Sequence, residues 1–190
     1  MKKGIVIGFV VLLIAVVAVL GLVSAKRPKE PKLVGFKSEQ GVSFSYRADL
    51  AVRALSDQDK KDKYLFRAAQ PSDQPPLLIT LRYEKGIKAV ADISKTEPLE
   101  LLVSNTRLAY PKRFPGYREI RQRRYEINNH QAAEFVFSYQ NKGEALKQQF
   151  LIVMKDDNTA YYLALQVKEG DYDKLFPAYF EPITNSLIIN

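Results

Sequence analysis

The stretch AAEFVFSYQNKGEALKQQFLIVMKDDNTAYYLALQVK, residues 132–168, decides the fold. Apolar and polar residues alternate in three runs, at 132–139, 145–154 and 159–168. The turn sequences Asn141-Lys142-Gly143 and Asp156-Asp157-Asn158 separate these runs. A period of two between polar turns is typical of an antiparallel meander with one buried face. The stretch therefore predicts three consecutive antiparallel strands.

Other segments extend this sheet and add helices. Strand patterns precede the meander at 36–46 (two short strands around Glu39-Gln40-Gly41), 64–68, 77–83 and 118–127. Apolar residues at helical spacing predict one helix from Pro98 to a stop at Pro111, and a kinked closing helix after Asp171. The polar run 56–63 is predicted to be an exposed loop. Together these segments predict an α+β fold in which an antiparallel sheet packs against helices, as an α/β/α sandwich.

Length and composition restrict the function. A chain of 190 residues suits one domain plus accessory segments. It contains no cysteine, which excludes disulfides, thiolate nucleophiles and cysteine metal sites. The formal net charge of +8 favours anionic partners.

The amino-terminal residues have the composition of a membrane segment. No charged residue lies between Gly4 and Ala25, and Lys2 and Lys3 precede this stretch. Its length fits a spanning helix of roughly 20 residues better than the shorter apolar core of a signal peptide. Val23-Ser24-Ala25, however, is an acceptable cleavage site. Residues 1–25 are therefore interpreted as a transmembrane anchor, with a cleaved signal peptide and a secreted product as the alternative.

Domain boundaries and orientation follow from this segment. Residues 26–35 are predicted to be a stiff linker, because prolines and charges dominate KRPKEPK, and residues 36–190 to be the globular domain. Basic residues flank both ends of the apolar stretch, and the positive-inside rule alone would keep the domain in the cytoplasm. The short basic head and signal-like end favour export instead. We expect a single-pass protein of the cell membrane whose domain is extracytoplasmic.

Several of these features resemble a known family. They are the opening hairpin FKSEQGVSFSY, the turn sequence Asn-Asn-His-Gln-Ala-Ala-Glu-Phe at 128–135, the two long strands after it, and a terminal helix ending in Ser186-Leu187-Ile188. The chain is similar in these respects, over residues 36–189, to PsbP-like proteins. The resemblance implies a PsbP-like α/β/α sandwich and a binding or assembly role without catalysis. It transfers no catalytic or metal residue.

The densest positive stretch is the candidate binding surface. It comprises Arg113, Arg118, Arg121, Arg123 and Arg124, with aromatic residues interleaved. Such a stretch fits an acidic protein or an anionic lipid, whereas no sequence signature of a nucleic-acid-binding module is present. The alternative interpretation is a solvated strand edge that resists aggregation. Regular alternation would put Arg121 and Arg123 on one face, and Arg118 and Arg124 on the other.

No pattern in the sequence indicates catalysis. His130 is the only histidine and has no Ser–His–acid grouping around it. Glu169, Asp171 and Asp173 lack the spacing of a calcium loop and suit a helix start instead. We therefore expect no cofactor, no metal site and no catalytic residue.

Three functions remain open. The first is a membrane-anchored binding or assembly module. The second is a carrier of an apolar small molecule in a cleft between the sheet and the terminal helix. The third, an enzyme, requires polar residues that only folding could bring together.

Overall fold

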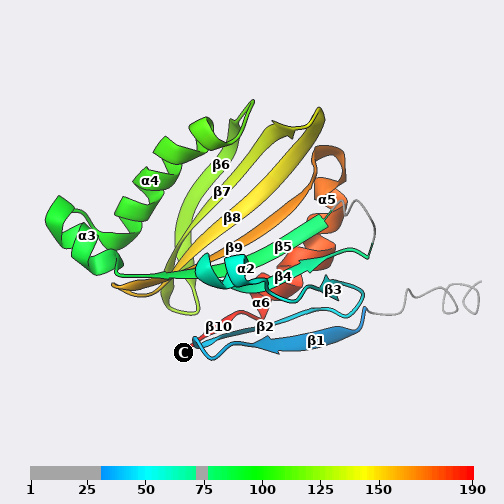
Figure 1. Cartoon of the computed structure of the whole chain (residues 1–190), viewed down its shortest axis with the longest axis horizontal. Helices are drawn as coiled ribbons and strands as arrows, with labels where there is room; N and C mark the ends of the chain where they lie inside the picture. Colours follow the sequence, from blue (N-terminus) through cyan, green and yellow to red (C-terminus); the bar gives the residue numbers. More distant parts are fainter. Residues whose placement is uncertain (1–30, 72–76) are drawn as a thin grey trace, which may run out of the picture. The chain divides into compact units, whose positions relative to one another are not determined.

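The structure is a computed structural model that describes residues 31–71 and 77–190. Its main element is a seven-stranded antiparallel sheet in the order β3-β4-β5-β9-β8-β7-β6 (Figure 1). The strands are β3 (Ala51–Val52), β4 (Tyr64–Ala69), β5 (Leu77–Lys85), β6 (Arg118–Ile127), β7 (His130–Asn141), β8 (Glu144–Asp156) and β9 (Thr159–Lys168). The predicted meander is β7-β8-β9, and it forms the centre of the sheet.

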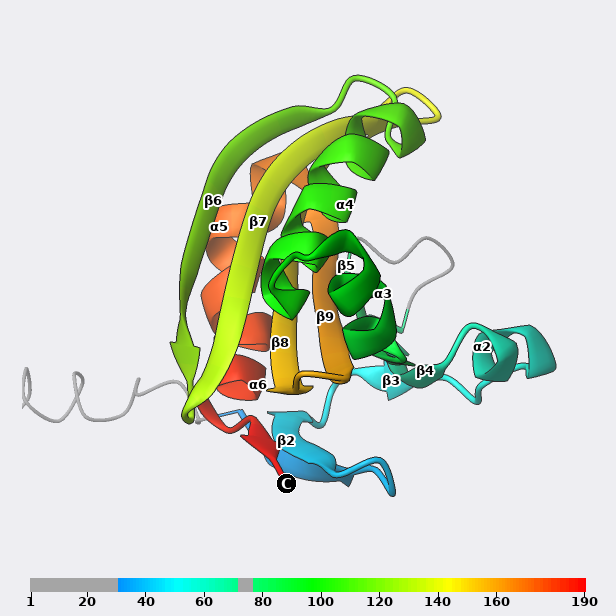
Figure 2. The ribbon, with the colours of Figure 1, turned by 90° about the vertical axis from the view of Figure 1, so that its left-hand side faces the viewer.

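Helices cover both faces of this sheet (Figure 2). On one face lie α3 (Ile87–Ser94) and α4 (Pro98–Arg113), and on the other lies a C-terminal helical segment of η1 (Glu169–Asp171), α5 (Tyr172–Leu175), η2 (Phe176–Phe180) and α6 (Glu181–Asn185). Each face carries its own apolar cluster, with Phe135 and Phe137 in the first and Val136 and Leu163 in the second. The expectation of one buried face was therefore wrong for β7, because every residue of 132–139 is buried.

A second, three-stranded sheet is built from both ends of the described chain. Its order is β1 (Leu33–Lys37), β2 (Val42–Arg47) and β10 (Ile188–Ile189). β1 begins at Leu33 because the backbone pairs Leu33 with Arg47, so the first strand includes residues 33–35 of the predicted linker. The turn before β7 is the predicted one. Asn128 and Asn129 both have positive φ, a conformation that asparagine tolerates better than most residues.

Two local predictions near α4 and β4 were wrong. The run 56–63 is not simply a loop, because α2 (Asp57–Lys61) forms there on a capping box between Ser56 and Asp59. Helix α4 does not stop at Pro111 but ends at Arg113. A proline removes only one hydrogen bond when it lies in the last turn, and the amide of Phe114 still donates to the carbonyl of Tyr110 at 2.9 Å. The helix therefore includes Arg113 in its last turn.

The predicted closing helix is divided into short helical turns, with Pro177 inside the π-helical turn η2 and Pro182 inside α6. No helix within residues 31–71 and 77–190 is long and apolar enough to cross a membrane. The predicted anchor, residues 1–25, lies outside the described residues.

Candidate functional site

A β-bulge decides which arginines of β6 share a face. β6 pairs with β7 so that Arg118 opposes Ser138 and Arg121 opposes Val136, with an extra residue between Glu119 and Arg121. Because facing residues of an antiparallel pair point to the same side, Arg118 lies on the face of Arg121 and Arg123. The regular alternation predicted for Arg118 was therefore wrong, whereas Arg124 does lie on the opposite face.

Arg121 and Arg123 are held by a buried carboxylate. The Glu134 side chain is fully buried on β7, and its Oε1 lies 2.9 Å from both Arg121 Nη2 and Arg123 Nε. Gln149 Nε2 donates to Glu134 Oε2 at 2.6 Å, and the Tyr172 hydroxyl donates to Gln149 Oε1 at 2.5 Å. This chain of hydrogen bonds joins the sheet to α5. A buried carboxylate needs such partners, so these two arginines serve the fold.

The remaining β6 arginines also meet carboxylates. Arg118 Nη2 lies 2.9 Å from Glu169 Oε1, and Arg124 pairs with Glu100 of α4. The five predicted residues therefore do not form one patch. Arg113 differs from the other four, because no ion pair of Arg113 occurs among the described residues.

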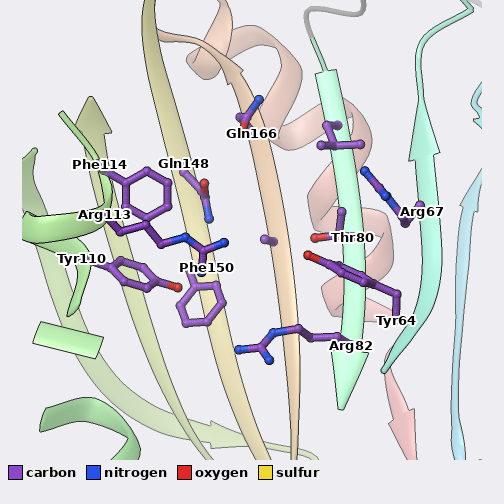
Figure 3. Close-up of a pocket in the computed structure, with 12 residues that line it drawn as sticks. Tyr64, Arg67, Thr80, Arg82, Tyr110, Arg113, Phe114, Gln148, Phe150 and Gln166 are labelled. Atoms are coloured by element: carbon purple, nitrogen blue, oxygen red, sulfur yellow. The ribbon is translucent and has the colours of Figure 1, made fainter. Parts of the chain in front are cut away.

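Arg113 lines a pocket of about 170 Å³ between the end of α4 and the sheet (Figure 3). We call this cavity the arginine pocket. Among the lining residues that the structure describes, three are arginines and none is acidic. They are Tyr64, Arg67, Leu78, Thr80, Arg82, Tyr110, Arg113, Phe114, Gln148, Phe150, Ala164 and Gln166.

On the face of the sheet that carries α4, the fold leaves the part around β5 partly uncovered. Along β5, Leu77, Ile79 and Leu81 point to the C-terminal helical segment and are fully buried, whereas Thr80 and Arg82 on the α4 face remain partly exposed. The last turn of α4 reaches over β8 and supplies Tyr110, Arg113 and Phe114 on one side of the cavity, while β4 and β5 supply the other (Figure 3). The pocket is thus a cleft beside the helix, floored by β8 and β9.

Two of the arginines in the pocket, Arg67 and Arg82, are held in different ways. Arg67 pairs with Asp59, whose carboxylate also accepts hydrogen bonds from Ser56 of the capping box. Arg67 Nε is buried and has no hydrogen-bond partner among the described residues. The Arg82 guanidinium carbon lies 4.2 Å from the centroid of the Tyr162 ring, so an aromatic face rather than a carboxylate supports this cation. Within the described residues, Arg82 forms no ion pair.

The tyrosine in the wall stays neutral. Burial raises the pKa of Tyr110 well above its usual value, and the charges of Arg82 and Arg113 oppose part of that rise. Both guanidinium groups therefore act on the same hydroxyl from opposite sides of the cavity. A neutral phenol can donate a hydrogen bond, whereas phenolate chemistry would need a far lower pKa. The described wall thus presents cations and neutral donors, an arrangement suited to holding an anion.

Sequence reasoning identified one of the three arginines in this pocket. The alternation in 77–83 already placed Thr80 and Arg82 together, opposite the apolar face of that strand. The alternation in 77–83 did not indicate that α4 would cover only part of the face that carries Thr80 and Arg82. Arg67 lay in a predicted strand without any distinguishing pattern.

The interface between the sheet and the terminal helical segment is filled. Tyr179, Phe180 and Ile183 are buried there against Leu163 and Leu165. A cavity beside it is lined mainly by polar residues, including Arg121, Arg123 and Glu134. This packing argues against the apolar cleft on which the carrier hypothesis depends.

Comparisons with known proteins identify the fold. No protein-family model matches the chain, and no curated protein matches its sequence. Cyanobacterial PsbP (CyanoP) from Synechocystis sp. PCC 6803 superposes with a TM-score of 0.56 at 6% identity, over 87% of this chain and 96% of CyanoP. The Ran-binding protein Mog1p of Saccharomyces cerevisiae gives 0.51 at 5% identity, over 84% and 96%.

A Bacteroides thetaiotaomicron protein gives a TM-score of 0.54 at 15% identity over 82% of this chain, which spans about half (48%) of that protein's length. The chain therefore has a PsbP-like fold, as the resemblance implied.

Proposed function

We propose that this protein is a membrane-anchored, non-catalytic binding module whose PsbP-like domain recognises an anionic partner outside the cytoplasm. One observation carries the binding proposal. Arg82 and Arg113 face a single small cavity that has no acidic residue in its described wall. Arg82 is partly buried and Arg113 is exposed. Like charges gathered beside one cavity repel each other unless an anion joins them, so such a cluster favours ligand binding.

The groups in the arginine pocket support binding rather than reaction. Arginine stays protonated at physiological pH and is a poor general base, and the raised pKa of Tyr110 keeps its phenol protonated. Among residues 31–71 and 77–190 no three His, Asp or Glu side chains are grouped so that they could hold a metal ion. The wall thus offers hydrogen-bond donors but no base or nucleophile poised at neutral pH.

The same fold elsewhere also serves association, since Mog1p is named as a Ran-binding protein. At such low identity this likeness concerns the fold alone.

The anchor part of the proposal rests on the uncharged stretch from Gly4 to Ala25. Membranes washed with alkaline carbonate should retain the protein, and protease added outside intact cells should digest the domain. Release by carbonate, or protection from external protease, would refute this part alone.

Anion binding is tested on the full-length protein in phosphatidylcholine nanodiscs. The midpoint of thermal unfolding should rise with sulfate relative to chloride at equal ionic strength, because a ligand that binds only the folded state stabilises it. The rise should persist in Arg107→Gln, a control on the same helix but outside the pocket, and disappear in the double variant Arg82→Gln/Arg113→Gln. Equal rises in all three proteins would reject the pocket as the binding site.

A further inference from the structure

The charge balance of the arginine pocket suggests the class of its ligand. Three arginines line the cavity, and among residues 31–71 and 77–190 the one carboxylate paired with them, Asp59, is already shared between Arg67 and Ser56. Within this part of the chain, Arg82 and Arg113 have no counter-charge. A ligand group that carries two negative charges matches this excess, whereas a single carboxylate leaves one cation unpaired.

The directions of the hydrogen-bond donors in the arginine pocket also favour a ligand group with two negative charges. Arg82 and Thr80 rise from β5, Gln148 and Gln166 from the sheet floor, and Arg113 extends from α4 on the far side (Figure 3). A carboxylate is planar and is satisfied by one arginine fork, whereas a phosphate offers three terminal oxygens in different directions. Donors that surround a cavity thus suit a tetrahedral oxyanion.

We infer that the arginine pocket binds the phosphate group of a phosphate monoester, with Arg82 and Arg113 on opposite sides of its terminal oxygens. This inference rests on the anion binding proposed above and narrows it. A phosphate monoester carries about 1.5 to 2 negative charges at pH 7, which matches the charge excess.

The size of the cavity limits what enters it. Its volume of about 170 Å³ is below the roughly 300–1,000 Å³ of sites that enclose whole small molecules. The phosphate group and its first substituent atoms therefore fill it. Tyr110 at the end of α4 contacts Phe114 edge-to-face and the Phe150 ring of the floor at a tilt, with its ring centroid 5.1 Å from that of Phe114 and 5.3 Å from that of Phe150. These rings form an apolar wall for an aryl or acyl continuation of the ligand.

The experiment compares two ligands of similar shape and different charge. Full-length protein in phosphatidylcholine nanodiscs is titrated calorimetrically with phenyl phosphate and with benzoate, at pH 8 and constant ionic strength. Phenyl phosphate should bind at least about tenfold more tightly than benzoate, since each additional charge-assisted hydrogen bond contributes about one such factor. Its affinity should fall as pH drops through about 6, where the phosphate gains its second proton.

Variants locate the site. Arg82→Gln and Arg113→Gln should each lower the affinity for phenyl phosphate about tenfold or more, while Arg107→Gln leaves it unchanged. Far-ultraviolet circular dichroism and the unfolding midpoint of each variant in chloride establish that it is folded. Loss of binding without loss of folding supports the inference.

The possible sources of the phosphate give different results. A soluble ester is indicated by binding of phenyl phosphate in phosphatidylcholine nanodiscs. A lipid headgroup is indicated if only nanodiscs containing phosphatidic acid raise the unfolding midpoint, and if Arg82→Gln abolishes that rise. Equal affinities for benzoate and phenyl phosphate would overturn the phosphate assignment and leave anion binding standing. Binding of no anion in either format would overturn both proposals.

Discussion

Arg118 and Arg121 lie on the same face of β6 although three positions separate them. In a regular strand, residues 118 and 121 would point to opposite faces. The extra residue of the bulge, Ile120, puts both arginines on the same face. Both side chains consequently reach carboxylates on the side of the C-terminal helical segment, Glu169 for Arg118 and Glu134 for Arg121. The bulge thus couples the outer strand of the sheet to its centre and to η1.

The bulge makes a prediction about two deletions. Deleting Ile120, which is 46% exposed, would give a regular ladder in which Arg118 and Arg121 keep their faces. Deleting Gln122 would also remove the bulge, but it would move Arg121 to the face opposite Glu134. We expect the Gln122 deletion to cost about 1–2 kcal/mol more in urea unfolding, because a half-exposed charged hydrogen bond is lost. Equal costs would contradict the assigned register.

Glu134 should contribute more to stability than any single arginine bound to it. Glu134→Gln keeps the shape of the side chain but turns an NH₂ group toward donors of Arg121, Arg123 or Gln149. We expect a loss of about 1–3 kcal/mol in the free energy of unfolding, limited because both arginines are about half exposed. Arg113→Gln, with no such ion pair, should change it by less than about 0.5 kcal/mol. A loss for Glu134→Gln as small as that of this control would refute the role of the buried carboxylate.

Alkaline pH should unfold the domain through its buried tyrosines. Burial raises the pKa of Tyr139 and of Tyr172 to about 12, against an ordinary value near 10. Between these values the unfolded chain releases protons that the folded chain retains, so stability is complete below pH 10 and falls as pH rises toward 12. The absorbance of tyrosinate at 295 nm should therefore increase together with unfolding. Ionisation of all tyrosines near pH 10 in a folded protein would contradict this assignment.

A carboxylate introduced into the arginine pocket should replace the ligand. Thr80→Glu places an acid beside Arg82 and Arg67, and we expect it to abolish the rise of the unfolding midpoint that sulfate or phenyl phosphate produces. Thr80→Gln, which has the same size without the charge, should retain most of that rise. The comparison separates charge from bulk. Retained binding in Thr80→Glu would place the anion elsewhere.

Much of the sheet could be predicted from the sequence because its signals are local. Alternation and turn residues located β7, β8 and β9, and helical spacing located α4. The bulge at Ile120 could not be predicted, since nothing in REIRQRRYEI marks which residue is extra. Its effect was to reverse the predicted face of Arg118.

The candidate site depends on tertiary packing to a greater degree. Arg82 and Thr80 were placed on a common face by alternation, and Arg113 was selected for its charge. Their meeting depends on where α4 ends, and helix ends are set by a balance of single hydrogen bonds around Pro111. The pairing of Arg121 and Arg123 with Glu134 likewise depends on strand register. Because both arginines are bound to this carboxylate, they are not free to bind an anionic partner.

The arginine pocket is tested most directly by a crystal structure of the protein grown with phenyl phosphate. The account predicts electron density for the phosphate group within hydrogen-bond distance of the guanidinium groups of Arg82 and Arg113, with the phenyl ring against Phe114 or Phe150. An empty pocket at saturating ligand, or phosphate bound instead at Arg121 and Arg123, would contradict it.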